Sequence, residues 1–139
     1  MSSITPFEKI QEDFQVIEDW EDRYRYIIEL GKKLPPLSDH FKTDATKVRG
    51  CASQVWIHTT SSGTPSILAF QADSDALIVK GLIAILLGLY SGKTAAEILQ
   101  IDATSALATL SLESNLSQQR TNGLYSMIER IRSVANHWT

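Results

Sequence analysis

The stretch SQVWIHTTSSGTPSILAFQA, residues 53–72, decides the fold. In residues 53–60 two sets of side chains alternate, with Val55 and Ile57 in one set and Trp56 and His58 in the other. Serine, glycine, threonine and proline fill residues 61–65, and residues 67–72 are again rich in apolar and aromatic side chains. Alternation, a turn and a second short run are typical of two antiparallel strands. The stretch therefore predicts a β-hairpin.

Helical patterns lie on both sides of this hairpin. The apolar run 76–90 predicts a buried helix, which Asp73 or Ser74 is expected to cap. A second helix is expected to stop at Gly31, and residues 37–49 show no period and predict a loop. Further helices are expected to begin after side chains that can cap them, namely Thr5, Asp19, Thr94 and Asp102, and an apolar stripe predicts a last helix from about Ser117. The chain therefore predicts an α+β fold, a short antiparallel sheet flanked by helices, in one domain over residues 1–139.

The composition excludes several classes of protein. The chain is 43% apolar and 21% charged, which is typical of a globular domain. Its net charge of −3 offers no basic excess for nucleic-acid binding. The run 76–90 contains Lys80 and is shorter than the about 20 residues that span a membrane. The first residues carry no secretory signal, so a cytoplasmic protein is expected.

One cysteine dominates the chemistry of the sequence. Cys51 follows Gly50 at the start of the hairpin, where a loop is expected to meet a strand. A free cysteine is by default a small buried apolar residue. However, reactive groups often lie on loops, and Lys47 and Arg49 are near enough in sequence to favour a thiolate. A single cysteine allows neither an internal disulfide nor an all-cysteine metal site.

Other polar residues form weaker candidates. His40, His58 and His137 share no metal-ligand spacing, so no metal and no cofactor are expected. Arg120 lies in the first turn of the last predicted helix, where a cation is electrostatically unfavourable, and we expect either a specific acidic partner or a solvated side chain. The arginines Arg130 and Arg132 are expected on the outer side of that helix.

Four segments together resemble the SufE-like proteins. In chain order these are WEDRYRYIIELG (20–31), GCASQVWI (50–57), DSDALIVKGLIA (73–84) and RTNGL (120–124). The order is that of the family. The resemblance implies an α+β fold shared with IscU-type scaffold proteins, and a persulfide carried on Cys51. It places Asp75 and Arg120 near the cysteine, with Gly50 providing a deformable turn before it.

The resemblance also implies a function. The protein would accept sulfur from a pyridoxal-phosphate-dependent cysteine desulfurase of the SufS or CsdA type, activate that enzyme, and pass the sulfur on for iron–sulfur cluster assembly. It would be a carrier rather than a free-standing enzyme. A scaffold for iron–sulfur clusters would need several thiolate ligands, and this chain has one cysteine. Two alternatives remain open: a paralogue that serves molybdenum-cofactor or tRNA sulfur chemistry, and a cysteine-dependent hydrolase that uses a histidine. The oligomeric state, a homodimer among the options, is also open.

The cysteine is expected to alternate between two states. A thiol held in water is open to oxidation, and a buried thiol is unreactive. We therefore expect residues 45–53 to rest with Cys51 turned inward and to swing out when the desulfurase docks. A hydrogen bond between Arg120 and Asp75 is expected to hold the resting form.

Overall fold

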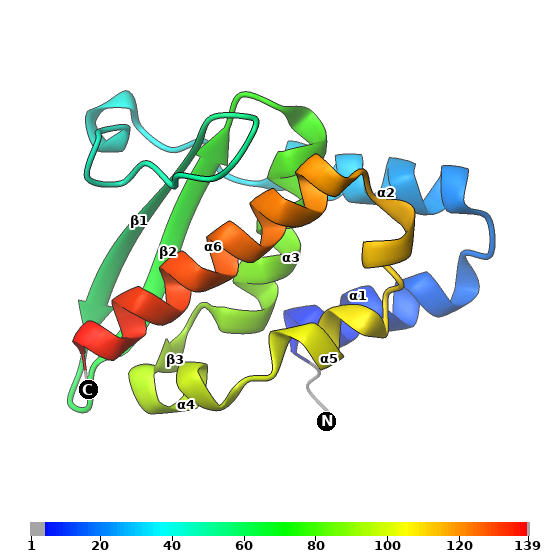
Figure 1. The fold of residues 1–139 in the computed structure, drawn as a ribbon. Coiled ribbons are helices and arrows are strands. Elements are labelled where there is room, and N and C mark those ends of the chain that lie inside the picture. The colour runs from blue at the N-terminus through cyan, green and yellow to red at the C-terminus, as the bar shows by residue number, and fades with distance from the viewer. Residues whose placement is uncertain (1–4, 139) are drawn as a thin grey trace.

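Two long antiparallel strands form most of the sheet in the computed structural model, which describes residues 5–138 (Figure 1). Strand β1 (Val55–Ser62) pairs with β2 (Ile67–Ser74) in a register that runs from Val55 opposite Ser74 to Ser62 opposite Ile67. Gly63 lies in the turn with a φ of 85°, a conformation that glycine adopts without steric cost. The predicted hairpin is confirmed. A two-residue strand, β3 (Lys93–Thr94), pairs with the start of β2 and was not predicted.

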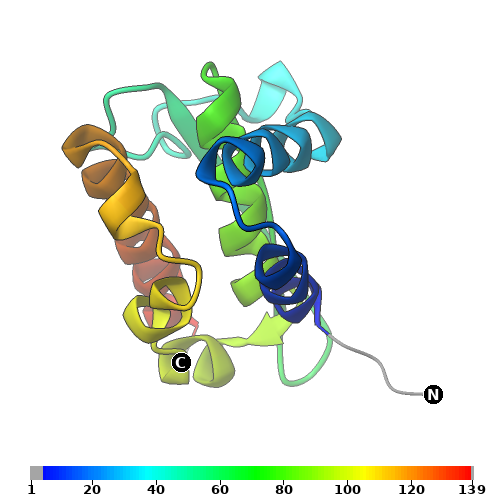
Figure 2. The same cartoon turned by 90° about the vertical axis from the view of Figure 1, so that its right-hand side faces the viewer.

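The helices cover one face of this sheet. Their bounds are α1 (Pro6–Val16), α2 (Trp20–Lys33), α3 (Leu77–Tyr90), α4 (Ala95–Gln100), α5 (Ala103–Ala108) and α6 (Gln118–His137), with single 3-10 turns at Asp39–Phe41 and Glu113–Asn115. Figure 2 shows α3 between α6 on one side and α1 and α2 on the other. The predicted α+β fold is confirmed. Within residues 5–138 no helix combines the length and the apolar character needed to cross a bilayer.

The core lies between α3 and the sheet. Ile85, Leu86 and Tyr90 of α3 are almost fully buried, as are Val55 and Leu68 of the strands. Alternation along β1 buries Val55 and Ile57 and leaves Trp56 and His58 half-buried, because successive side chains of a strand point to opposite faces.

Most of the predicted helix caps are present. Thr5 and Thr94 form complete capping boxes with the glutamates three residues later. The side chains of Asp19 and Asp102 each accept a hydrogen bond from a backbone N–H in the first turn of the helix that follows, and Ser117, which was not predicted as a cap, does the same. The local signals were sufficient because a cap depends only on residues two or three positions apart.

Two predicted helix ends are wrong. Helix α2 continues past Gly31 to Lys33, since Gly31 does not cap it but packs against α3, where an added Cβ would lie 2.7 Å from the Gly81 nitrogen. Helix α3 begins at Leu77 and its N-cap, Ala76, provides no side-chain hydrogen bond. Ser74 instead accepts a hydrogen bond from the N–H of Ala76 (3.2 Å).

Asp73, the other expected cap, joins three segments instead. Its side chain is buried and accepts hydrogen bonds from the N–H groups of Ser74 (2.8 Å) and Leu37 (3.2 Å). Lys42 and Lys80 lie 3.4 and 3.3 Å from its two oxygens. The carboxylate therefore fixes the segment after α2 to the end of β2 and to α3.

Candidate functional site

Cys51 lies at the tip of a second, narrow hairpin. Residues 46–48, in the expected loop, pair with the start of β1: the N–H of Val48 donates to Val55 O, and the N–H of Ile57 donates to Thr46 O, both at 2.8 Å. Lys47 and Trp56 face each other as an antiparallel bridge. We call residues 46–48 and 55–57 the stem and residues 49–54 the cysteine loop. The only cysteine of the sequence is therefore carried on a short loop with a fixed base.

The cysteine loop lies against the first half of α6. Gly50 has a φ of 89°, and an added Cβ would lie 2.5 Å from the Ser126 hydroxyl oxygen. One turn earlier, the Cys51 thiol donates a weak hydrogen bond to the carbonyl oxygen of Gly123, with a sulfur–oxygen distance of 3.6 Å. The three atoms nearest to an added Cβ at Gly123 all belong to Cys51, at 3.6 Å or more. Gly50 is therefore the glycine that the close approach of loop and helix requires, and Gly123 lies in ordinary contact with the cysteine.

Burial governs the ionisation of the cysteine. Cys51 is half-buried, and burial raises the pKa of its thiol, because the thiolate is less well solvated than the thiol. The expectation that Lys47 and Arg49 would favour the thiolate is therefore not met in this state. The resting cysteine is a neutral thiol.

A small cavity surrounds the thiol. It measures about 20 Å³, slightly more than the about 10–15 Å³ that one water needs. Its apolar wall comes from α3 and α6 and its polar rim from the cysteine loop and the start of α6. The residues that line it with Cys51 are Ala52, Ser53, Val79, Leu82, Gln119, Arg120, Gly123, Leu124 and Met127.

The structure brings Asp75 and Arg120 to this site but not to each other. Asp75 accepts a hydrogen bond from the N–H of Gln54 (3.0 Å), and its own N–H donates to Gln54 O (3.3 Å), so it holds the end of the cysteine loop. Arg120 is exposed at the rim of the cavity. Among residues 5–138 no ion pair or hydrogen bond joins these two side chains, so the expected contact is wrong. Asp75 bonds to the backbone next to it instead.

The sequence analysis predicted the wrong positions for two arginines, Arg130 and Arg132. Both are half-buried rather than on the outer side of α6. The Arg130 guanidinium donates to the carbonyl oxygens of Lys47 (3.0 Å) and Ala45. The Arg132 guanidinium donates to the carbonyl oxygens of Leu99 (3.2 Å) and Ile101 (3.4 Å). No sequence signal pointed to these contacts, because they join residues far apart in the chain.

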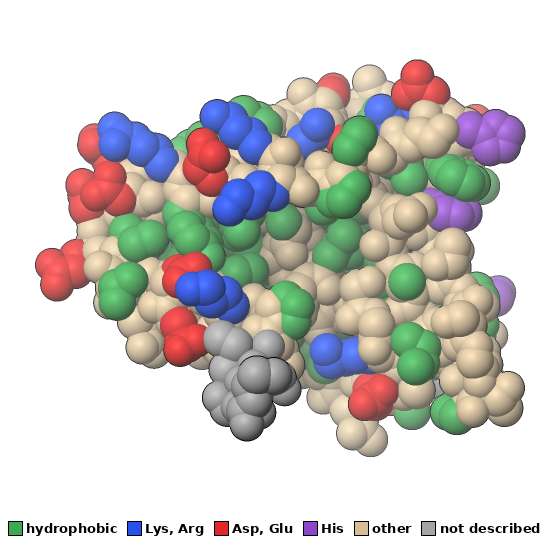
Figure 3. All heavy atoms as spheres, turned by 180° about the vertical axis from the view of Figure 1, so that it is seen from behind, with side chains coloured by type: hydrophobic (Ala, Val, Ile, Leu, Met, Phe, Trp, Pro, Cys, Tyr) green, Lys and Arg blue, Asp and Glu red, His purple; other side chains and the backbone are tan. Residues whose placement is uncertain are grey.

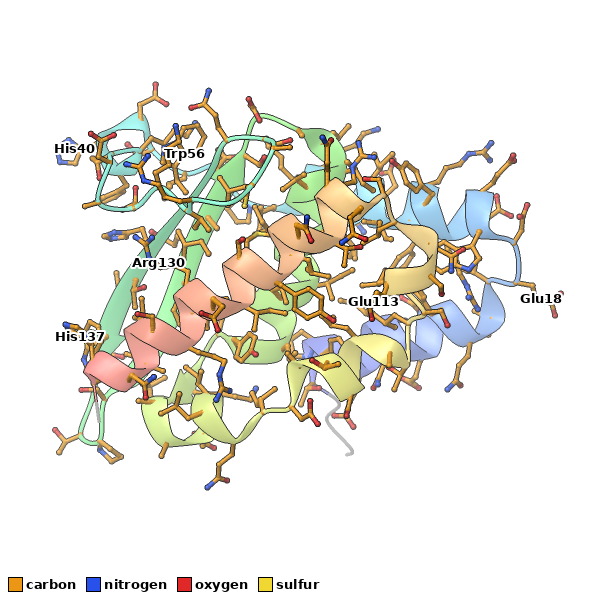
Figure 4. All side chains as sticks on the ribbon, viewed as in Figure 1. Glu18, His40, Trp56, Glu113, Arg130 and His137 are labelled. Atoms are coloured by element: carbon orange, nitrogen blue, oxygen red, sulfur yellow. The ribbon has the colours of Figure 1, made fainter. Side chains whose placement is uncertain are left out.

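The histidines lie away from the cavity. Histidine side chains gather along one edge of the molecule, where Figure 4 labels His40 and His137 (Figures 3 and 4). His58 stacks on Phe41 with ring centres 4.1 Å apart, and His40 meets the same ring edge-on. Neither lines the cavity of Cys51. In the part of the chain that the structure describes, no three histidine, cysteine, aspartate or glutamate side chains lie together in a way that could hold a metal ion.

Comparison with known proteins supports the resemblance. The SufE family model, described as an Fe-S metabolism associated domain, matches residues 8–135. A SufE-like protein of Rhizobium etli is 54% identical over 130 residues, which cover 92% of this chain and 88% of that protein. A SufE-like protein of Rhizobium meliloti is 49% identical over 134 residues, which cover 95% and 96% of the two chains.

A solved structure shares the fold. The solution structure of a hypothetical protein from Thermus thermophilus superposes with a TM-score of 0.76 over 98% of both chains, at 18% identity. Because the family model and the two relatives extend over nearly the whole chain, the assignment does not depend on the cysteine segment alone. The chain belongs to the SufE family, whose domain is associated with iron–sulfur metabolism.

Proposed function

We propose that the protein accepts sulfur from a cysteine desulfurase and carries it as a persulfide on Cys51 for iron–sulfur cluster assembly. The observation that carries this proposal is the placement of the only cysteine of the chain: a half-buried thiol in a cavity with room for one further atom, on a loop with a fixed base. Family membership supports the link to iron–sulfur metabolism. The protein would act in the cytoplasm as a carrier and activator.

The transfer is an exchange between a thiol and a persulfide. Sγ of Cys51, as a thiolate, attacks the outer sulfur of the persulfide on the desulfurase cysteine. A new S–S bond forms at Cys51 while the S–S bond of the donor breaks, and the donor cysteine leaves as a thiolate that takes up the proton lost from Cys51. No electrons are gained or lost overall, so this protein needs no cofactor for the step.

The resting state must open before this exchange. The raised pKa keeps Cys51 a thiol, which is a poor nucleophile, and its S–H is directed at Gly123 O. Movement of the cysteine loop into the desulfurase site would restore solvation or supply a charged partner and so lower the pKa. Arg120 is exposed at the rim of the cavity, and its charge would stabilise the thiolate or persulfide as the loop moves.

The closed state would protect the product. A persulfide has one more heavy atom than a cysteine, and the cavity of about 20 Å³ offers space of that order. Its apolar wall would keep the outer sulfur away from water and oxidants between partners. This protection matters because the chain has no second cysteine with which to resolve a sulfenic acid.

The experiment is a mass measurement. The protein is incubated with a SufS- or CsdA-type desulfurase, pyridoxal phosphate and cysteine, and the intact mass and a peptide map are recorded. We expect a gain of one sulfur atom on Cys51, which is removed by a small thiol. The variant Cys51→Ser should fold and bind the desulfurase but gain no sulfur and give no stimulation. Stimulation by this variant equal to that by the wild type would refute the acceptor role.

A further inference from the structure

Arg130 occupies a special position relative to the cysteine. It lies on α6, two turns after Gly123 and one turn after Ser126, so these three residues follow one stripe of the helix. Gly123 and Ser126 contact the cysteine loop. Arg130, labelled in Figure 4, contacts the stem. The stripe therefore follows the whole hairpin that carries Cys51, from its base to its tip.

The contact of Arg130 meets the free edge of the stem. In antiparallel pairing, carbonyl groups point alternately toward and away from the partner strand. Thr46 O points toward β1, since it accepts from the N–H of Ile57. The carbonyl groups of Ala45 and Lys47 therefore point away, and both accept hydrogen bonds from the Arg130 guanidinium. The planar, forked guanidinium suits such a pair of acceptors, and a lysine does not.

The tip of the same hairpin is held much more weakly. The hydrogen bond of Cys51 to α6 is a weak sulfur–oxygen contact of 3.6 Å, and Gly50 and Ala52 on either side are exposed. The far end of the cysteine loop is held by Asp75, through Gln54. Hydrogen bonds to strong acceptors therefore lie at the two ends of the loop, and the part that carries the thiol has weaker hydrogen bonding between them.

We propose that Arg130 is a positioning residue, which anchors the stem to α6 and thereby sets how often Cys51 leaves its cavity. This inference deepens the proposed function and depends on it for its biological purpose. With Arg130 in place, opening is confined to the cysteine loop. Without it, the stem can separate from α6 and the thiol is exposed more often.

The chain provides a matched control. Arg132 lies on the same helix, is also half-buried, and also donates two hydrogen bonds to backbone carbonyls, but these belong to Leu99 and Ile101 at the end of α4. The variants Arg130→Gln and Arg132→Gln remove the same charge and two hydrogen bonds to backbone carbonyls each, and Arg132→Gln also removes the interaction of Arg132 with Tyr90. Any difference between them in the reactivity of Cys51 reports the stem contact and not a general loss of stability.

The test measures the alkylation of Cys51 by iodoacetamide in the free protein, without urea and at low urea concentrations. Rates that do not depend on urea identify local opening rather than global unfolding. We expect Arg130→Gln to raise the rate at least about ten-fold, the lower end of the effect of losing one hydrogen bond from a charged donor. Arg132→Gln should change it less than about two-fold, because its contacts are far from the cysteine loop. Arg130→Lys, a second variant in case the first fails to fold, should give an intermediate rate.

A second measurement, the alkylation of Cys51 in the presence of a desulfurase, separates a role of Arg130 in holding the stem from a general loosening of the fold. If a desulfurase that lacks its own cysteine accelerates alkylation of the wild type by opening the loop, it should accelerate Arg130→Gln less, because that variant is already partly open. Equal effects of the Gln variants at positions 130 and 132, or no effect of either, would overturn the proposal. Failure of the proposed function would look different: no sulfur would appear on Cys51 of the wild type, whatever the alkylation rates.

Discussion

Gly123 of α6 lies directly against Cys51, and a methyl group at this glycine would lie 3.6 Å from the cysteine sulfur. That distance is ordinary van der Waals contact, so Gly123→Ala fits the structure. Alanine also favours a helix over glycine, by about 0.5–1 kcal/mol. We therefore expect Gly123→Ala to unfold at a higher urea concentration and, because the methyl group covers the sulfur, to be alkylated more slowly at Cys51. Faster alkylation would show that the methyl group expels the thiol.

The pH dependence of alkylation should reveal the burial of the thiol. Burial raises the pKa of Cys51, so the rise in its alkylation rate should be centred above the about pH 8.5 of an unstructured cysteine. The raised pKa also means that the folded state binds a proton that the unfolded state has released. Stability should therefore fall as the pH rises from about 8.5 toward the folded pKa, and Cys51→Ser should lack this fall. A rate profile identical to that of a cysteine peptide would contradict the buried state.

Asp73 should be a major source of stability. Burial alone would raise the pKa of this carboxyl group, but the N–H groups of Ser74 and Leu37 and the ammonium group of Lys80 outweigh burial and lower it. Its contribution is therefore complete above the ordinary pKa of about 3.9, and is lost as the pH falls through the lowered folded value.

We expect Asp73→Asn to lower the free energy of unfolding by about 2–4 kcal/mol at neutral pH, because two lysines lose their partner at a buried site. The difference from the wild type should shrink at acidic pH. Asp22→Asn provides the control, since the pair of Asp22 with Arg25 is exposed and should contribute little. Urea titrations at several pH values measure both variants, and equal losses would show that burial of the carboxylate is unimportant.

The crossing of α2 and α3 depends on one glycine. A Cβ at Gly81 would collide with the carbonyl oxygen of Ile27, which is backbone and cannot move aside. Gly81→Ala should therefore cost more than about 3 kcal/mol, as overpacking in a rigid core does.

Gly88 lies on the same helix, but an added Cβ there would meet the Pro6 side chain at 3.4 Å. We expect Gly88→Ala to be neutral or slightly stabilising. Thermal unfolding of both variants tests this pair, and tolerance of alanine at position 81 would mean that the helices can separate at small cost.

The sequence predicted what depends on neighbours along the chain. The hairpin followed from the alternation in residues 53–60, and the caps at Thr5 and Thr94 from a threonine and a glutamate three residues apart. The third strand escaped prediction because two residues hold no period.

The candidate site was predicted only in part. Cys51 and the turn at Gly50 could be identified because a lone thiol and a glycine are visible in the sequence. The cavity, the stem and the contacts of Arg130 join segments up to 85 positions apart, and no local pattern encodes them. Asp73 was predicted to cap α3 because it lies just before that helix in the sequence. Its contact with Lys42 depends on the fold and is not encoded by neighbouring residues.

The cavity around Cys51 also implies a selectivity by size. Its about 20 Å³ would accept a single sulfur atom, but a glutathione molecule or the cysteine of another protein is many times larger. Mixed disulfides with such thiols, and a disulfide between two copies of this chain, would fit poorly beside the half-buried sulfur and would form faster while the cysteine loop is displaced. In the closed state the protein would therefore react with thiols more slowly than an exposed cysteine does, and a displaced loop would expose Cys51 to every thiol in the medium.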